Sequence, residues 1–80
     1  MKREEIYKKL TEIFRDVFDD ETLIINDNTS ADDIDEWDSL SHISLISAIE
    51  YEFDFRFDMK AVQKLENVGQ MVDLISDSIN

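Results

Sequence analysis

The chain has 80 residues, of which 20 are acidic and 8 are basic, so its formal net charge is −12 at pH 7. This length predicts one domain over residues 1–80, and the strong negative charge argues against nucleic acid as a partner. A chain of this size buries only about 60% of its unfolded surface, so a water-excluded active site, and hence an enzyme, is not expected. Apolar residues make up 42% of the sequence, which is enough for a compact core.

Cysteine is absent, which excludes disulfides, thiolate metal sites and a cysteine nucleophile within the chain. The first residues alternate in charge, and the longest aliphatic run is Leu23–Ile25, so neither a signal sequence nor a membrane span is expected. The sequence therefore predicts a cytoplasmic protein, which we expect to be a monomer.

The residue pattern predicts an all-α fold. Proline is absent and Gly69 is the only glycine, so Asp, Asn and Ser must form the turns. An amphipathic helix is predicted over residues 3–18 from apolar residues at helical spacing, namely Ile6, Leu10, Ile13, Phe14, Val17 and Phe18. The periodicity then stops over residues 19–38, which predicts a long ordered loop that presents something at its end. Its expected anchors to the core are Leu23–Ile25, Ile34 and Trp37.

A second helix is predicted from Asp38, a favoured N-cap residue, to about Phe53. Its inward face is formed by Leu45, Ile46, Ile49 and Phe53. Residues 53–57 alternate apolar and polar, but without a partner strand they are expected to form a turn.

Two further helices follow. A short one over Met59–Leu65 is predicted with Asp58 as its cap, and the last one begins at Val68, behind a capping box formed by Asn67 and Gln70. The expected fold is a four-helix bundle with three main helices, a short third helix and a long first loop.

Charge is distributed unevenly along the chain. Residues 1–15 contain five bases and three acids, a net charge of +2, whereas residues 16–38 contain ten acids and no base, a net charge of −10. Such a run is either a solvated surface or a patch that attracts a basic partner. It ends at Asp38 and Ser39, where the amino end of the second helix favours an anion attached to Ser39. Plain helix capping is the alternative interpretation.

The chain resembles acyl carrier proteins over essentially all of its 80 residues. Asp38-Ser39-Leu40 resembles the phosphopantetheine attachment motif of that family. Leu45, Ile46, Ile49, Glu50 and Phe53 resemble the second helix of the family. Upstream, Ile25 to Ser30 and Asp33-Ile34 resemble its first loop. Downstream, Glu50 to Asp54 resembles the acidic end of its second helix.

The resemblance implies a non-catalytic carrier. A phosphopantetheinyl transferase would move 4′-phosphopantetheine from coenzyme A, with Mg²⁺, onto the hydroxyl of Ser39. The new thiol would hold an acyl group as a thioester and present it to partner enzymes, which resolves the lack of cysteine. Asp38 would cap the helix and help the transferase to position Ser39.

The resemblance also implies that partners such as an acyl-loading ligase or synthase, and acyltransferases, offer basic patches to the second helix. By position, Leu40 and Ile43 are the apolar candidates for this interface, and Glu50 and Glu52 are the acidic ones. Partial burial in the core is the alternative interpretation of Leu40 and Ile43.

The sequence also departs from the family pattern. Ser41, Ser44 and Ser47 stand where many fatty-acid carriers have acids or a methionine, and Trp37 stands where many have a small residue. We interpret these differences as a sign of a specialised pathway of the fatty acid or polyketide type. An aryl or aminoacyl carrier is disfavoured because Gly-Gly is missing before Ser39. A helical interaction module without cargo remains an alternative.

Two other classes are disfavoured. Ser39 and His42 lie one helical turn apart, but the chain has no G-x-S-x-G elbow that would support a hydrolase. His42 is expected to be solvated, with a raised pKa.

The second disfavoured class is a calcium switch. The acidic segment 27–38 fails the EF-hand pattern, since Asp32 stands where glycine is needed. No specific metal site is predicted, but the crowded acids should bind Mg²⁺ loosely and favour the folded state.

Overall fold

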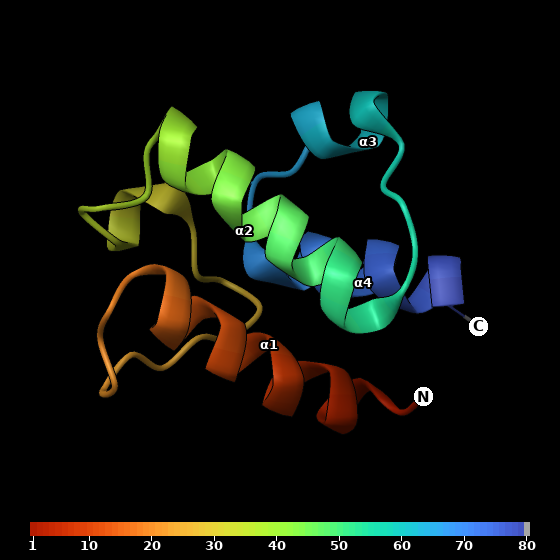
Figure 1. The fold of residues 1–80 in the computed structure, drawn as a ribbon, viewed down its shortest axis with the longest axis horizontal. Helices are drawn as coiled ribbons and strands as arrows, with labels where there is room; N and C mark the ends of the chain where they lie inside the picture. Colours follow the sequence, from red (N-terminus) through yellow and green to blue (C-terminus); the bar gives the residue numbers. More distant parts are fainter. Residues whose placement is uncertain (80) are drawn as a thin grey trace.

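The computed structural model describes residues 1–79, and all of its regular structure is helical (Figure 1). The elements are α1 (Arg3–Val17), the single 3₁₀ turn η1 (Ala31–Asp33), α2 (Ser39–Phe53), α3 (Met59–Gln63) and α4 (Val68–Ile79). The prediction of three main helices, a short third helix and a long first loop is therefore confirmed. Within residues 1–79, none of the helices combines the length and the apolar character needed to cross a lipid bilayer.

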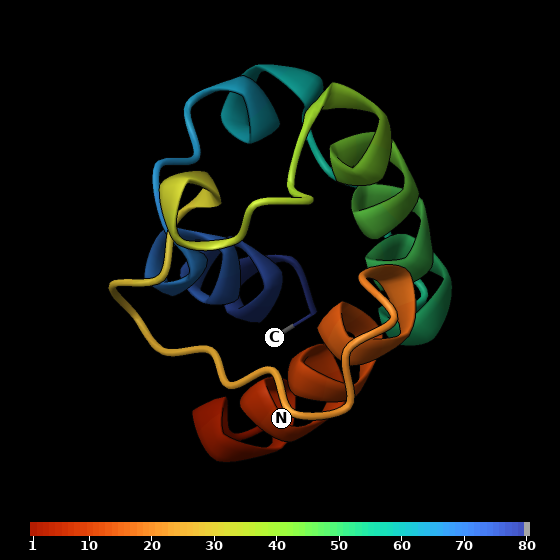
Figure 2. The ribbon, with the colours of Figure 1, turned by 90° about the vertical axis from the view of Figure 1, so that its left-hand side faces the viewer.

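Helix α1 packs against both α2 and α4. Figures 1 and 2 show that the start of α1 and the end of α4 lie at one end of the molecule, whereas α2 begins at the opposite end. The helices bury their apolar stripes against one another; the fully buried side chains are Ile6, Leu10, Phe14, Leu45, Ile49, Val68, Met71, Val72 and Ile75. The start of α2 is thus held by a packed core while remaining open to solvent.

The long loop between α1 and α2 is anchored largely as the sequence predicts. Ile25 and Ile34 are buried, and Leu23 and Trp37 pack against the core. Ile24 was also expected to be an anchor, and that expectation is wrong, because its side chain is 76% exposed. In this extended segment neighbouring side chains point to opposite sides, so Ile24 faces away from the core that Leu23 and Ile25 contact.

The same loop supports the start of α4. The backbone N–H groups of Val68 and Gly69 donate to the carbonyl oxygens of Thr29 at 2.8 Å and Asp27 at 3.1 Å. Loop carbonyls thereby satisfy N–H groups that the first turn of a helix cannot pair internally. The carboxylate of Asp27 also accepts hydrogen bonds from Arg3, at 2.9 Å, and from the hydroxyl of Tyr7. These bonds tie the loop to both α1 and α4.

Glu50 organises the connection between α2 and α3. Helix α2 ends at Phe53 and is followed by its C-cap Asp54, whose backbone is left-handed with a φ of 56°. The carbonyl of Glu50 accepts from the N–H of Phe55 at 3.2 Å, and its carboxylate accepts from the N–H of Phe57 at 2.8 Å. The rings of Phe55 and Phe57 meet edge to face with centroids 4.7 Å apart. Residues 53–57 therefore form the predicted turn that anchors aromatic side chains.

The caps of the last two helices follow the sequence with small differences. Asp58 accepts from the N–H of Lys60 at 3.0 Å and caps α3, which ends at Gln63, two residues before the predicted end. Asn67 accepts from the N–H of Gln70 at 2.8 Å, as the predicted capping box requires. The side chain of Gln70, however, accepts from the N–H of Glu66 and not from that of Asn67. The reciprocal half of the box is thus displaced by one residue.

Candidate functional site

Ser39 is the first residue of α2, and its side chain is exposed. Asp38 precedes it as the N-cap, with Oδ1 accepting from the N–H of Leu40 at 3.1 Å and from that of Ser41 at 2.9 Å. The hydroxyl of Ser41 accepts from the N–H of Asp38 at 2.8 Å and completes a capping box. These bonds fix the first turn of α2 and with it the position of Ser39.

The Asp38 carboxylate is held in its charged form. Its hydrogen bonds with the backbone N–H and the hydroxyl of Ser41 lower the pKa of Asp38 from its ordinary value. In the part of the chain that the structure describes, by contrast, no hydrogen bond involves the hydroxyl of Ser39. Ser39 thus offers an unoccupied hydroxyl beside a rigid, negatively charged cap.

Ser39 opens onto a groove of about 520 Å³ between α2, α3 and the long loop. Its lining residues are Ala31, Trp37, Asp38, Ser39, His42, Met59, Val62, Gln63 and Leu65. The volume lies within the range of small-molecule sites, and apolar side chains form much of the wall. The groove can therefore shelter a chain-like group that is attached to Ser39.

Trp37 and His42 form a hydrogen-bonded pair in this groove. The indole Nε1–H of Trp37 donates to Nδ1 of His42 at 3.1 Å, and the two rings stack with an interplanar angle of 23°. Trp37 also contacts the core residue Phe14, whose ring meets it edge to face with centroids 5.3 Å apart. Trp37 is therefore a loop anchor packed on the core, as predicted.

The expected environment of His42 is wrong. The sequence suggested a solvated imidazole whose pKa is raised by nearby acids, but burial beside Trp37 lowers the pKa of His42 from its ordinary value. The geometry also speaks against a hydrolase, because Nδ1 of His42 accepts from Trp37 and no hydrogen bond joins His42 to Ser39 in residues 1–79. Asp38 is engaged with the backbone instead of orienting the imidazole.

The apolar interface candidates face solvent. Leu40 is 78% exposed and Ile43 is 64% exposed, so their interpretation as partly buried core residues is wrong. They lie three residues apart on α2 and share one face beside Ser39. Met59, at the start of α3, is 65% exposed and lines the groove, which adds a third accessible apolar side chain near Ser39.

The acidic interface candidates lie farther along α2. Glu50 is ten residues beyond Leu40, a rise of about 15 Å. The carboxylate of Glu50 is partly occupied by the N–H of Phe57, and that of Glu52 lies 3.5 Å from the ammonium of Lys9 on α1. The structure does not bring these acids together with Leu40 and Ile43.

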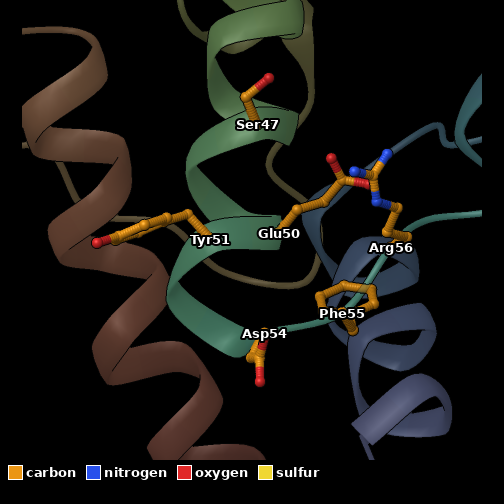
Figure 3. A pocket seen from close by; sticks show the side chains of 6 residues that line it. All are labelled: Ser47, Glu50, Tyr51, Asp54, Phe55 and Arg56. Carbon is orange, nitrogen blue, oxygen red and sulfur yellow. The ribbon is translucent and has the colours of Figure 1, made fainter.

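Glu50 instead lines a second, polar depression of about 610 Å³ at the other end of α2 (Figure 3). The other lining residues are Ser47, Tyr51, Asp54, Phe55 and Arg56. Figure 3 shows the Tyr51 side chain pointing away from that of Glu50. Except for Glu50, this depression contains none of the predicted site residues, and it is remote from Ser39.

Comparisons with known proteins agree with this geometry. Residues 8–75 match the family model described as the phosphopantetheine attachment site. The chain belongs to the acyl carrier protein family. Its cofactor is therefore phosphopantetheine, covalently attached, and its role in the family is to carry acyl groups for enzymes and not to catalyse.

Two relatives of this carrier support the assignment. An acyl carrier protein from Petrotoga mobilis is 32% identical over 81 residues, covering 100% of this chain and 94% of the relative. The solution structure of a holo acyl carrier protein from Geobacter metallireducens is 45% identical and superposes with a TM-score of 0.86. That superposition covers 91% of this chain and 84% of the other.

Sequence reasoning missed the pairing of Trp37 with His42 as part of the carrier's groove. A signal was present, since His42 follows Ser39 by three residues and must share its helix face. What no local pattern could give is the position of Trp37, which depends on its packing against Phe14 on α1.

Among the residues described, no three acidic or histidine side chains gather closely enough to hold a metal ion.

Proposed function

We propose that Ser39 is the residue to which phosphopantetheine is attached. The observation that supports this most directly is the exposed, unbonded hydroxyl of Ser39 at the first residue of α2, beside the groove. The N–H groups of a helix start favour a negatively charged phosphodiester at this position. The capping box of Asp38 and Ser41 keeps that turn in place before and after modification.

The attachment is a phosphoryl transfer from coenzyme A. The oxygen of Ser39 forms a bond to the phosphorus that bears pantetheine, the phosphoanhydride bond breaks, and adenosine 3′,5′-bisphosphate leaves. The hydroxyl proton goes to a base of the transferase, and Mg²⁺ bound there stabilises the charge of the leaving group. When attached, phosphopantetheine supplies the thiol that holds an acyl group as a thioester. The charged Asp38 carboxylate next to Ser39 is available to the transferase and its Mg²⁺.

Partner enzymes would approach the end of the molecule where α2 begins. Leu40 and Ile43 are exposed beside Ser39, and the preceding segment, residues 16–38, carries ten acids and no base. A basic patch on an acyl-loading ligase, a synthase or an acyltransferase is complementary to this surface. The acids accelerate encounter, while the apolar pair gives the contact its centre. Screening over a Debye length of about 8 Å at 0.15 M salt should weaken such docking.

The pathway we propose is a specialised one of the fatty acid or polyketide type. Ser44 and Ser47 are exposed and uncharged, so the middle of α2 carries no charge on its outer face. This carrier therefore offers fewer acids along the helix than many fatty-acid carriers do. Enzymes that rely on acids at those positions should dock poorly. The cytoplasmic location and the monomeric state stay predictions.

Intact mass spectrometry tests the attachment. The protein is incubated with coenzyme A, Mg²⁺ and a broad-specificity phosphopantetheinyl transferase, next to the variants Ser39→Ala and Ser44→Ala. Ser44 is a matched control, being another exposed serine of α2. We expect the wild type and Ser44→Ala to gain one phosphopantetheine and Ser39→Ala to gain none. If folded, unmodified wild-type protein gains nothing, a helical interaction module without cargo becomes the better assignment.

A further inference from the structure

His42 is placed next to the proposed attachment residue with its ring orientation fixed. Its side chain and that of Ser39 line the same groove, one helical turn apart on α2. The ring is half-buried, stacks on Trp37, and accepts the indole N–H at Nδ1 over 3.1 Å. A nitrogen that accepts a hydrogen bond carries no proton, so the proton of the neutral imidazole is on Nε2.

Nε2–H of His42 has no partner in the described chain. The hydrogen bond with Trp37 accounts for Nδ1 only, and no side-chain nitrogen or oxygen in residues 1–79 is buried without a partner. Nε2–H is therefore a donor that solvent, or a group attached nearby, can reach. Trp37 thus fixes both the tautomer of His42 and the direction in which its free donor points.

The groove around Ser39 lacks other cationic groups. Its lining residues include Asp38 but neither lysine nor arginine, and residues 16–38 carry a net charge of −10. A phosphodiester on Ser39 adds another negative charge to this surface, which like-charge repulsion disfavours. His42 is the one lining side chain that can take up positive charge and also donate to a phosphate oxygen.

We propose that Nε2–H of His42 donates a hydrogen bond to the phosphodiester that links phosphopantetheine to Ser39. His42 is in this role a positioning residue: it directs the first bonds of the arm along the groove, past Met59 and Leu65, instead of into bulk solvent. The inference rests on the proposed attachment at Ser39. It assigns the ligand of His42 as a phosphate oxygen, not an amide of pantetheine or the acyl group.

The charge of the phosphodiester makes this contact measurable. A negatively charged oxygen in hydrogen-bond contact with Nε2 favours the imidazolium, so the midpoint of the His42 titration should rise by roughly 1 pH unit or more on attachment. The other charged groups near His42 are Asp38, which lines the same groove, and Glu66, which together with His42 lines an adjoining cavity of about 90 Å³. Both are present in the apo and the holo protein, so their influence cancels in the difference.

The experiment is an NMR titration of the apo and holo proteins from pH 4.5 to 8, after intact mass has established the conversion. We expect the higher His42 midpoint in the holo form, and a ³¹P shift that titrates with that same midpoint. In holo His42→Gln, which keeps an N–H donor but does not ionise, the ³¹P step should vanish. An unchanged His42 midpoint, or a ³¹P shift that is the same in both holo proteins, would overturn the inference while leaving the attachment intact.

Two further outcomes separate the possible failures. A change in the Nε2–H proton shift without a change in midpoint would mean that a neutral amide of pantetheine is the acceptor, and the phosphodiester assignment would fall. No mass gain on the wild type would overturn the proposed attachment at Ser39 and this inference with it.

Discussion

Gly69 lies directly against the backbone of Asp27. A Cβ atom at Gly69 would be 3.0 Å from both the carbonyl oxygen and the Cβ of Asp27, and 3.1 Å from its Cα. This close approach lets the N–H of Gly69 donate to that carbonyl, which supports the start of α4. The loop that leads to Ser39 is therefore held in place at a point where any side chain would crowd the backbone of Asp27.

The variant Gly69→Ala should lose stability. Alanine improves helix propensity by at most about 1 kcal/mol, and overpacking against a backbone that cannot move freely costs about 1 to 3 kcal/mol, so we expect a net loss of up to about 2 kcal/mol. Urea unfolding measures it. Asp77→Ala, at an exposed position of the same helix, should change stability by no more than about 0.5 kcal/mol. A Gly69→Ala protein as stable as the wild type would contradict the close contact.

Glu50 and Glu52 should differ in their contribution to stability. Glu50→Ala leaves the half-buried N–H of Phe57 without its acceptor and should cost about 1 to 3 kcal/mol, whereas Glu50→Gln keeps an acceptor oxygen and should cost less. Glu52→Ala removes only an exposed pair with Lys9 at 3.5 Å, worth up to about 1 kcal/mol. Chemical denaturation compares the three variants, and an equal loss in Glu50→Ala and Glu52→Ala would refute the assigned role of Glu50.

Stability should decrease as the pH falls below the ordinary pKa of histidine. Burial makes the pKa of His42 lower in the folded protein than in the unfolded chain, where it is near 6.5. Below pH 6.5 the unfolded chain therefore binds more protons, and the stability associated with neutral His42 is lost until the folded pKa is reached. The Tm of the wild type should fall more between pH 7.5 and 5.5 than that of His42→Gln. Parallel curves for the two proteins would show that His42 is not the source.

Asp38 should matter for stability even though its carboxylate is exposed. Asp38→Ala removes the acceptor for two N–H groups of the first turn, so the Tm should fall by several degrees, while Asp38→Asn, which retains an oxygen acceptor, should lose less. Thermal unfolding followed by circular dichroism provides the measurement. Because hydrogen bonds lower the pKa of Asp38, this contribution is present at neutral pH and is lost as the pH falls below the ordinary value of 3.8 toward the folded pKa.

Millimolar Mg²⁺ should raise the Tm at low ionic strength. The net charge of −12 makes the folded chain repel itself, and a divalent cation that gathers near the acids relieves this repulsion. The same ionic strength supplied as NaCl should raise the Tm less. A differential scanning fluorimetry series with no rise in Mg²⁺ would show that the acids are too far apart to gain from it.

Helices and caps were predictable from the sequence because their causes are local. The spacing of Ile6, Leu10 and Phe14 defines the buried stripe of α1, and Asp38 caps α2 where a capping residue is expected. The turn η1 was missed because three residues carry no periodic pattern. Ile24 was misplaced because an apolar run does not say which of its members faces inward.

The parts of the site that the sequence could not give depend on contacts between distant segments. The pKa of His42 was expected to be raised by acids near it in sequence, but Trp37, which Phe14 of α1 holds in place, shields it from water. Glu50 was expected to face partners because the resemblance to acyl carrier proteins implies that the acids of the second helix do so. The turn after α2 brings the N–H of Phe57 back to its carboxylate, a contact over seven residues that no helical period encodes.

Trp37 is the chain's single tryptophan, and it lies two residues before Ser39, in hydrogen-bond contact with His42. The tryptophan fluorescence of the protein therefore comes from one indole at the wall of the groove. Loading of the carrier, protonation of His42 and the arrival of a partner enzyme are each expected to alter the surroundings of that ring. The protein contains its own optical reporter, so these events can be followed in real time on unlabelled material.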